Sequence, residues 1–453
     1  MSAENPRYFA DADGSIVYLT GSHTWSNLKD MGATDPPPEF DYPGYLDMLQ
    51  RYGHNFIRLW TWELSRYGYD GRTSYATPFP WPRTGPGEAL DGKPPFDLSR
   101  LEQAYFDRLR SRVTAAGERG IYVSIMLFEG HGLHASDAPW CWDGHPFNVR
   151  NNINGIRGDP DGDGRGLEIQ TLQIPAVTEL QEAYVRKVIE TVNDLDNVLY
   201  EIANESGAYS TEWQYHFIRF IHEQERGMSQ QHPVGMTFQW CGGEQRGTNQ
   251  TLFDGPADWV SPNPDGGYRD DPPAADGSKV IITDTDHLWG IGGNQQWVWK
   301  SFCRGMNPIF MDPCSPPIES EVPAGAETTW TEHLTGLARL DPKWDPIRTS
   351  MGYTRQFASR MDLARAVPHD ELASTGYCLA QPGVEYVVYL PEGREATVDL
   401  SAAQGSLTAE WFNPSTGETV ARTATQAGAR RALRAPFAGD AVLYLHRDGE
   451  GAD

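Results

Sequence analysis

Residues 197–206 read NVLYEIANES, an apolar segment that ends in the polar pair Asn204 and Glu205. The run from Asn197 to Ile202 has the length and the apolar content that are typical of a buried strand. A helix is expected before it, because Pro175 opens a stretch in which apolar residues recur every three or four positions. A helix followed by a buried strand is the repeating unit of a parallel α/β sheet.

The same alternation of short apolar runs with helical stripes extends from about residue 15 to residue 360. It predicts helices after Asp41, after Asp97, from Pro175, and around 294–304 and 345–361. Eight strands are expected, which is the number in a (β/α)₈ barrel. They cover residues 16–19, 55–60, 121–128, 197–202, 234–238, 259–261, 280–283 and 308–311. The fold class is therefore predicted as α/β, with a TIM barrel over residues 1–364.

The pattern changes near residue 365. Short alternating segments such as 386–390, 409–412 and 441–445 are separated by turn sequences, of which Asn413-Pro414-Ser415-Thr416-Gly417 is the clearest. We find no helical stripe in this part of the sequence. Residues 365–453 are therefore predicted to form a small all-β sandwich.

Composition and charge exclude several classes of partner. The chain has 453 residues and a formal net charge of −25, which opposes binding to a phosphate backbone, so we expect no nucleic-acid partner. No stretch approaches the roughly 20 apolar residues of a membrane span, so no membrane partner is expected. Five scattered cysteines without a CxxC pair, and a start at Met1 without the features of a signal peptide, predict a cytoplasmic protein. The sequence leaves open whether the chain forms a homo-oligomer.

Polar and aromatic side chains follow nearly every predicted strand. The C-terminal ends of the strands hold the active site in a (β/α)₈ barrel, so these side chains are expected to meet there. The chain also has 15 Trp residues, whose faces can stack on sugar rings or fill the core. The candidate site residues are His23, Arg58, Trp60, Glu129, Asn204, Glu205, Trp240, Asp284, Asp286, His287 and Trp289.

The carboxyl groups in this set indicate one kind of chemistry. Cleavage of a glycosidic bond needs two carboxyl groups, one protonated and one ionised, on either side of the bond. Glu205 follows the fourth predicted strand, and Asp284 and Asp286 follow the seventh. The residues alone leave open which Asp is the partner of Glu205, and Glu129 is a further candidate.

Several of these segments resemble a known family. Leu199–Glu205 resembles the strand-four motif of clan A glycoside hydrolases, the cellulase-like retaining (β/α)₈ enzymes. Phe56–Trp60 is similar to the second strand of that clan, and Val280–Asp284 aligns with the strand that carries its nucleophilic Glu. Trp411–Glu418 resembles a β-sandwich that is often appended to such barrels and is labelled as collagen-binding.

The resemblance implies a role for each matching residue. Glu205 would be the acid/base, Asn204 would bind the 2-hydroxyl group of the sugar, and Arg58 would support the nucleophile. This sequence departs from the clan because strand seven carries Asp where the clan has Glu. The shorter side chain could shift the carboxylate separation from ~5–5.5 Å, which gives retention, toward the ~6.5–9.5 Å that admits a water and gives inversion.

The function predicted from these observations is an exo-acting, retaining glycoside hydrolase that removes a terminal sugar from a small carbohydrate. Long insertions at 63–96 and 129–173 favour a pocket over an open cleft. His23 and His287 are expected to hold hydroxyl groups, and the site Trp residues are expected to stack on sugar. A sugar transglycosylase, a lyase and a non-catalytic carbohydrate-binding protein are the alternatives.

No cofactor is expected for this chemistry, and no metal is expected among the catalytic residues. Asp159, Asp161 and Asp163, followed by Gly164, match the start of an EF-hand calcium loop. Position twelve of that loop is Gln170 instead of the usual Glu. A structural calcium ion bound by these aspartates and a plain acidic turn are both compatible with the pattern.

Overall fold

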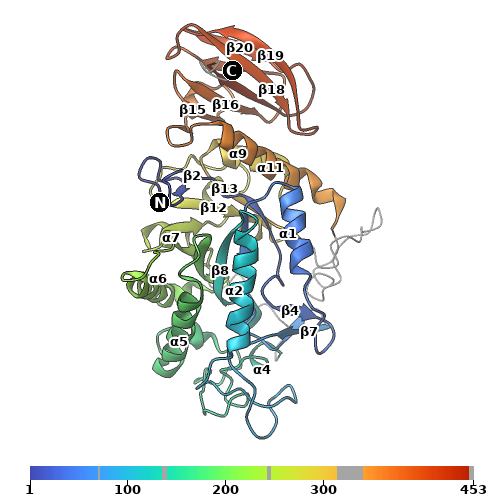
Figure 1. The fold of residues 1–453 in the computed structure, drawn as a ribbon, viewed down its shortest axis with the longest axis vertical. Helices are drawn as coiled ribbons and strands as arrows, with labels where there is room; N and C mark the ends of the chain where they lie inside the picture. Colours follow the sequence, from blue (N-terminus) through green and yellow to red (C-terminus); the bar gives the residue numbers. More distant parts are fainter. Residues whose placement is uncertain (70–71, 135–139, 242–245, 314–339, 448–453) are drawn as a thin grey trace.

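The computed structural model describes residues 1–69, 72–134, 140–241, 246–313 and 340–447, and its core is a parallel barrel (Figure 1). Neighbouring strands pair in the order β3-β13-β12-β11-β10-β9-β8-β5. The two end strands also lie side by side, because Asn55 N donates a hydrogen bond to Thr20 O over 3.0 Å next to them. The strands are β3 (Gly21–His23), β5 (Phe56–Leu59), β8 (Tyr122–Glu129), β9 (Val198–Asn204), β10 (Val234–Thr237), β11 (Trp259–Ser261), β12 (Val280–Asp284) and β13 (Asn307–Met311). The predicted α/β barrel is confirmed.

Helices surround this barrel and bury their apolar faces against it. Asp41 caps the first helix by accepting a hydrogen bond from Gly44 N over 3.0 Å, and Pro175 begins α5, as the sequence predicts. The helices are α1 (Tyr42–Arg51), α2 (Gln103–Gly117), α5 (Pro175–Val192), α6 (Thr211–Glu225), α7 (Asn249–Asp254), α8 (Thr285–Trp289), α9 (Gln295–Cys303) and α11 (Asp345–Arg360). Among the described residues, no helix combines the length and hydropathy needed to cross a membrane.

Two expected element positions are wrong. Ile16–Val17 forms β2, which pairs antiparallel with β1 (Phe9–Ala10) outside the barrel, and the first barrel strand is β3. Asp97 does not cap a long helix, since its carboxylate accepts hydrogen bonds from the backbone N and the hydroxyl of Ser99. Such local turns compete with helix formation, and α2 begins only at Gln103.

The long segments that follow the first strands build a layer that the sequence did not predict. β4 (Asp30–Gly32), β7 (Arg72–Thr77) and β6 (Arg66–Tyr69) form a three-stranded antiparallel sheet. The short helices α3 (His131–His134) and α4 (Trp140–Asp143) follow β8. In Figure 1, β7 and α4 lie at the end of the barrel that is farthest from the C-terminal domain.

The C-terminal part is an antiparallel β domain, as predicted. One sheet has the order β14-β15-β16-β21-β18-β19, and a second sheet pairs β17 (Glu395–Asp399) with β20 (Arg430–Arg434). The two sheets enclose a shared apolar core. The strands of the larger sheet are β14 (Val367–Pro368), β15 (Cys378–Gln381), β16 (Glu385–Leu390), β21 (Ala441–His446), β18 (Ser406–Asn413) and β19 (Glu418–Gln426).

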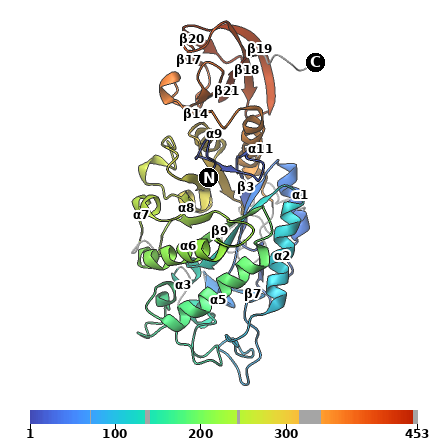
Figure 2. The same cartoon turned by 60° about the vertical axis from the view of Figure 1, so that its left-hand side comes forward.

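The other face of the larger sheet packs on α9 and α11, which lie directly beneath it in Figures 1 and 2. Trp299 of α9 stacks on Tyr389 of β16 with ring centroids 6.2 Å apart. Phe357 of α11 packs edge-on against Phe412 of β18 at 5.2 Å. Barrel helices and sandwich strands therefore share one buried aromatic cluster.

Candidate active site

Arg58, on β5, is the centre of a buried network at the C-terminal ends of the strands. Its Nε and Nη2 donate to the two carboxylate oxygens of Glu201 over 2.9 and 2.5 Å. Nη2 also donates to Asn204 Oδ1 over 2.7 Å, and Nη1 donates to Asp284 at 2.9 Å and Asp286 at 3.2 Å. One guanidinium group therefore orients side chains from β9 and from the end of β12.

Asp284 is the last residue of β12 and is fully buried. His23 Nε2 lies 2.8 Å from one of its carboxylate oxygens, and Asp286 N donates to the other over 2.9 Å, so Asp284 caps α8. Burial acts to raise the pKa of Asp284, but the charges of His23 and Arg58 outweigh burial and hold the pKa below its ordinary value. Asp284 is therefore an ionised, fully bonded group.

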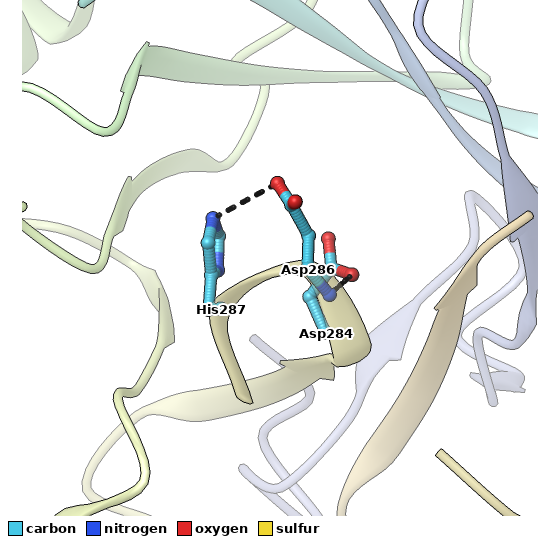
Figure 3. Close-up of side chains that lie close together, drawn as sticks. All are labelled: Asp284, Asp286 and His287. Carbon is cyan, nitrogen blue, oxygen red and sulfur yellow. Dashed lines mark hydrogen bonds and ion pairs between the residues drawn. The ribbon is translucent and has the colours of Figure 1, made fainter. Parts of the chain in front are cut away.

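Asp286 lies in the first turn of α8, two residues beyond the strand end, and its carboxyl group lies 3.8 Å from His287 Nε2 (Figure 3). Burial and the charge of Asp284 raise the pKa of Asp286 to about 7, although its hydrogen bond from Arg58 opposes the shift. The carboxyl group of Asp286 lines the cavity described below, whereas that of Asp284 does not.

Glu205 follows β9 with a backbone φ of +47°, a left-handed conformation that is uncommon outside glycine. His134 Nε2 donates to its carbonyl oxygen over 2.8 Å and holds this conformation in place. The carboxyl group lies 4.0 Å from His131 Nε2 and lines the same cavity as Asp286. Strained backbone of this kind occurs frequently at catalytic residues.

The pKa of Glu205 is raised well above its ordinary value. The causes are burial, then the charge of Asp286 and then that of Glu129. Asp286 therefore has a stronger effect on Glu205 than Asp284 has. Arg58 donates directly to Asp286 and not to Glu205, which favours the ionised form at Asp286 over the ionised form at Glu205.

Asn204 lines the cavity, and its amide oxygen contacts two neighbouring side chains. Its Oδ1 accepts from Arg58 over 2.7 Å and lies 3.3 Å from His287 Nε2, so the amide orientation is determined by these two donors. Burial lowers the pKa of His287 to about 3, and its Nδ1 lies 2.8 Å from Ser261 Oγ. A neutral His287 that donates from Nε2 and accepts from Ser261 satisfies both contacts.

The cavity above these groups has a volume of about 500 Å³, which is in the range of small-molecule sites. Its polar wall includes Asn204, Glu205, Asp286 and His287. The remainder is strongly aromatic. The rings are those of Trp25, Trp60, Trp62, Phe238, Trp240 and Trp289.

The structure divides the predicted site residues into three groups. The cavity is lined by Trp60, Asn204, Glu205, Trp240, Asp286, His287 and Trp289. His23, Arg58 and Asp284 are buried beneath it and hold one another. Glu129 is also buried, but its carboxylate accepts hydrogen bonds from Gly132 N at the start of α3 and does not line the cavity.

Sequence reasoning missed several residues of this site. Glu201 was detectable, because it is a charged residue inside a buried strand, where a charge needs a partner. Alternation along the strand places its side chain on the same face as that of Ala203. Phe238 falls inside the fifth predicted strand, but β10 ends one residue before it, at Thr237. Arg269 lies in the loop after β11, where no periodic pattern marks it. Trp25, Trp62 and His131 also line the cavity, and each lies two or three residues beyond the end of a barrel strand, which is the signal that could have found them.

Two groups of described residues bring together side chains that can bind a metal ion. Asp284, Asp286 and His287 place ligand atoms within 4.8 Å of one another, but Arg58 donates to both carboxylates and Ser261 contacts His287, so these atoms are already engaged.

The predicted calcium segment brings Asp159, Asp161 and Glu168 within the same distance, with Asp163 outside the group. Oxygens of Asp159 accept hydrogen bonds from Gly162 N and Gly164 N. A calcium ion at this loop stays a prediction.

Comparisons with known proteins agree with this architecture. A domain of unknown function (DUF6298) matches residues 72–239, and the model described as "Putative collagen-binding domain of a collagenase" matches residues 366–445. No curated protein matches the chain.

Solved structures share the whole fold. One described as a glycoside hydrolase has a TM-score of 0.59 at 14% identity, with 99% of this chain and 97% of that chain covered. A glycoside hydrolase family 5 structure from Bacteroides vulgatus ATCC 8482 has a TM-score of 0.61 at 15% identity, with coverages of 98% and 92%. The chain therefore has the barrel-plus-sandwich fold found in these two proteins.

Proposed function

We propose that this chain is a glycoside hydrolase in which Glu205 is the general acid/base and Asp286 is the nucleophile. The observation that carries the proposal is the pair of carboxyl groups on the wall of one aromatic cavity, of which only Asp286 receives a hydrogen bond from Arg58. Glycoside cleavage requires one protonated and one ionised carboxyl group in this arrangement. The shared fold with structures described as glycoside hydrolases supports the same class.

In the first step, the protonated Glu205 donates its proton to the glycosidic oxygen while the Asp286 carboxylate attacks the anomeric carbon. The leaving sugar or aglycone departs as an alcohol, and a glycosyl ester of Asp286 remains. In the second step, Glu205 takes a proton from water, the oxygen of that water attacks the anomeric carbon, and Asp286 is released. The free sugar has the configuration of the substrate.

The position of Asp286 supports its choice over Asp284. It lies in the first turn of α8, beyond the end of β12, which extends the reach of a side chain one methylene shorter than Glu. Asp284 is fully buried, accepts a hydrogen bond from Asp286 N as the N-cap of α8, and pairs with His23. Asp284 therefore serves to hold α8 and the network around Arg58 in place.

The size and lining of the cavity favour action at a chain end. A volume of about 500 Å³ suits a sugar and its leaving group, and the aromatic walls offer faces for stacking. The N–H groups of Asn204 are available to a sugar hydroxyl. We therefore propose an exo-acting enzyme that releases a terminal sugar.

The test begins with a screen of aryl pyranosides and furanosides, followed by NMR of the anomeric protons during turnover. Glu205→Gln and Asp286→Asn are each expected to lower kcat by about 10²- to 10⁴-fold. Adding azide to Asp286→Ala should yield a glycosyl azide of inverted configuration, whereas Glu205→Ala should yield one of retained configuration.

Other outcomes would redirect the assignment. First-formed product of inverted configuration from the wild type would make Asp286 a base that activates water. Products with a new glycosidic bond or an unsaturated sugar would indicate a transglycosylase or a lyase. Unchanged turnover in Glu205→Gln would overturn the proposal.

A further inference from the structure

Two arginines lie at the rim of the cavity, each over an aromatic ring that lines it. Arg269, which itself lines the cavity, has its guanidinium carbon 5.5 Å from the centre of the Trp289 ring. Arg246 has its guanidinium carbon 5.5 Å from the centre of the Phe238 ring. They come from the loops that follow β10 and β11, so they lie on the same side of the cavity mouth.

Arg269 is the permanent cation among the described residues that line the cavity. The other charged lining groups are the carboxyl groups of Glu205 and Asp286. The histidines are neutral, because burial lowers the pKa of both His131 and His287 to about 3. The net charge of −25 opposes the approach of an anion, so an acidic ligand in this cavity would need a local cation, and Arg269 supplies one.

Neither arginine is committed to a buried partner. Among the described residues, Arg269 makes an ion pair with Asp270 at 3.8 Å, and the two side chains are 48% and 86% exposed. Arg246 pairs with Asp265 at 2.9 Å, and these side chains are 41% and 63% exposed. Exposed pairs contribute little to stability and are readily exchanged for a ligand.

We propose that Arg269, assisted by Arg246, binds a carboxylate on the sugar next to the bond that is cleaved, so that the substrate is an acidic, uronic-acid-containing oligosaccharide. The planar guanidinium group matches the two oxygens of a carboxylate, and the Trp289 and Phe238 rings hold the arginines in position. This inference rests on the proposed glycoside hydrolase function of the same cavity.

The test measures binding separately from turnover. The inactive variant Glu205→Gln is titrated in a calorimeter with short oligogalacturonides and glucuronic-acid-containing oligosaccharides, each beside its carboxyl-reduced counterpart. The acidic form is expected to bind about tenfold more tightly than the reduced form, and added Arg269→Gln should remove most of that difference. Binding of the reduced form should change less than about twofold.

Arg219→Gln is the matched control, because Arg219 is an exposed arginine on α6 that also lies over a ring, 5.7 Å from the centre of Tyr215, away from the cavity. It should leave both affinities unchanged. Equal affinity for acidic and reduced ligands, or an equal loss for both in Arg269→Gln, overturns the inference.

The two proposals fail in different ways. Charge-selective binding that depends on Arg269, without hydrolysis of any ligand by the wild type, would leave the rim site standing and refute the glycosidase. Hydrolysis of the reduced oligosaccharides as fast as the acidic ones would leave the glycosidase standing and refute the rim site.

Discussion

Replacing Asp286 by asparagine is expected to stabilise the protein at pH 8 although it lowers kcat. The pKa of Asp286 is about 7 in the folded chain against an ordinary value of 3.8. Folding therefore takes up a proton between these values, and the stability of the wild type declines as pH rises from about 4 to 7. The amide side chain of the variant has no proton to lose, so Asp286→Asn escapes that decline.

The size of the effect follows from the shift. About three pKa units at 1.36 kcal/mol each give an upper value of about 4 kcal/mol. That shift already includes the charge and the hydrogen bond of Arg58. Part of the decline lies below pH 4.5, so we expect Asp286→Asn to gain about 3 kcal/mol on the wild type between pH 4.5 and pH 8.

Urea unfolding of wild type and variant across this pH range measures the difference. Asp194→Asn is the control, because Asp194 is exposed, lies away from the cavity, and has a lowered pKa, so this carboxylate stays ionised throughout the range. The difference in stability between that variant and the wild type should not change with pH. A difference between wild type and Asp286→Asn that is constant, or that shrinks toward pH 8, would refute the reasoning.

Three further predictions concern the same network. Arg58→Lys should lose the paired hydrogen bonds to Glu201 and lower the free energy of unfolding by roughly 3–5 kcal/mol. The control Arg186→Lys, at an exposed arginine, should change it negligibly. Thermal unfolding measures both variants, and equal losses would contradict the structural role of the buried Arg58. Asn204→Ala should lower kcat/KM by about 10²-fold on a substrate with a 2-hydroxyl group and much less on its 2-deoxy analogue, and equal losses would count against the contact. In the pH profile of kcat/KM, the acid limb should lie near pH 7, where Asp286 ionises. Asp284→Asn should move that limb to lower pH, because it removes a charge that raises the pKa of Asp286. If the limb does not move, a group other than Asp286 causes it.

The barrel was predictable because its strands are buried on both sides and read as short apolar runs between helical stripes. The position of Glu205 at the end of β9 was predictable for a related reason, since it directly follows such a run. Which of Asp284 and Asp286 lines the cavity was not predictable, because it depends on where β12 ends and α8 begins. That boundary is set by the hydrogen bond from Asp286 N to the Asp284 carboxylate, a cap that spacing alone does not distinguish from a continuing strand.

Parts of the fold and of the site that lie in long connecting segments were not predicted, for a physical reason. The sheet of β4, β7 and β6 lies in segments whose mixed polar and aromatic residues have no clear period. Arg269 is positioned by its contact with the ring of Trp289 on α8, a contact between separate segments that no local sequence pattern indicates. The misplaced start of α2 reflects the turn at Asp97, which a sequence pattern cannot separate from a helix cap.

The aromatic cluster between the sandwich and helices α9 and α11 has a consequence for how this chain can evolve and be engineered. A module joined by a flexible linker can be exchanged between proteins, but Trp299 and Phe357 belong to both halves here. Cutting the chain before β14 would leave their rings exposed on the barrel, as an adhesive surface prone to aggregation. Recombination with another barrel would therefore have to transfer α9 and α11 together with the sandwich. The segment that can be exchanged as one piece thus includes two helices of the barrel as well as the C-terminal domain.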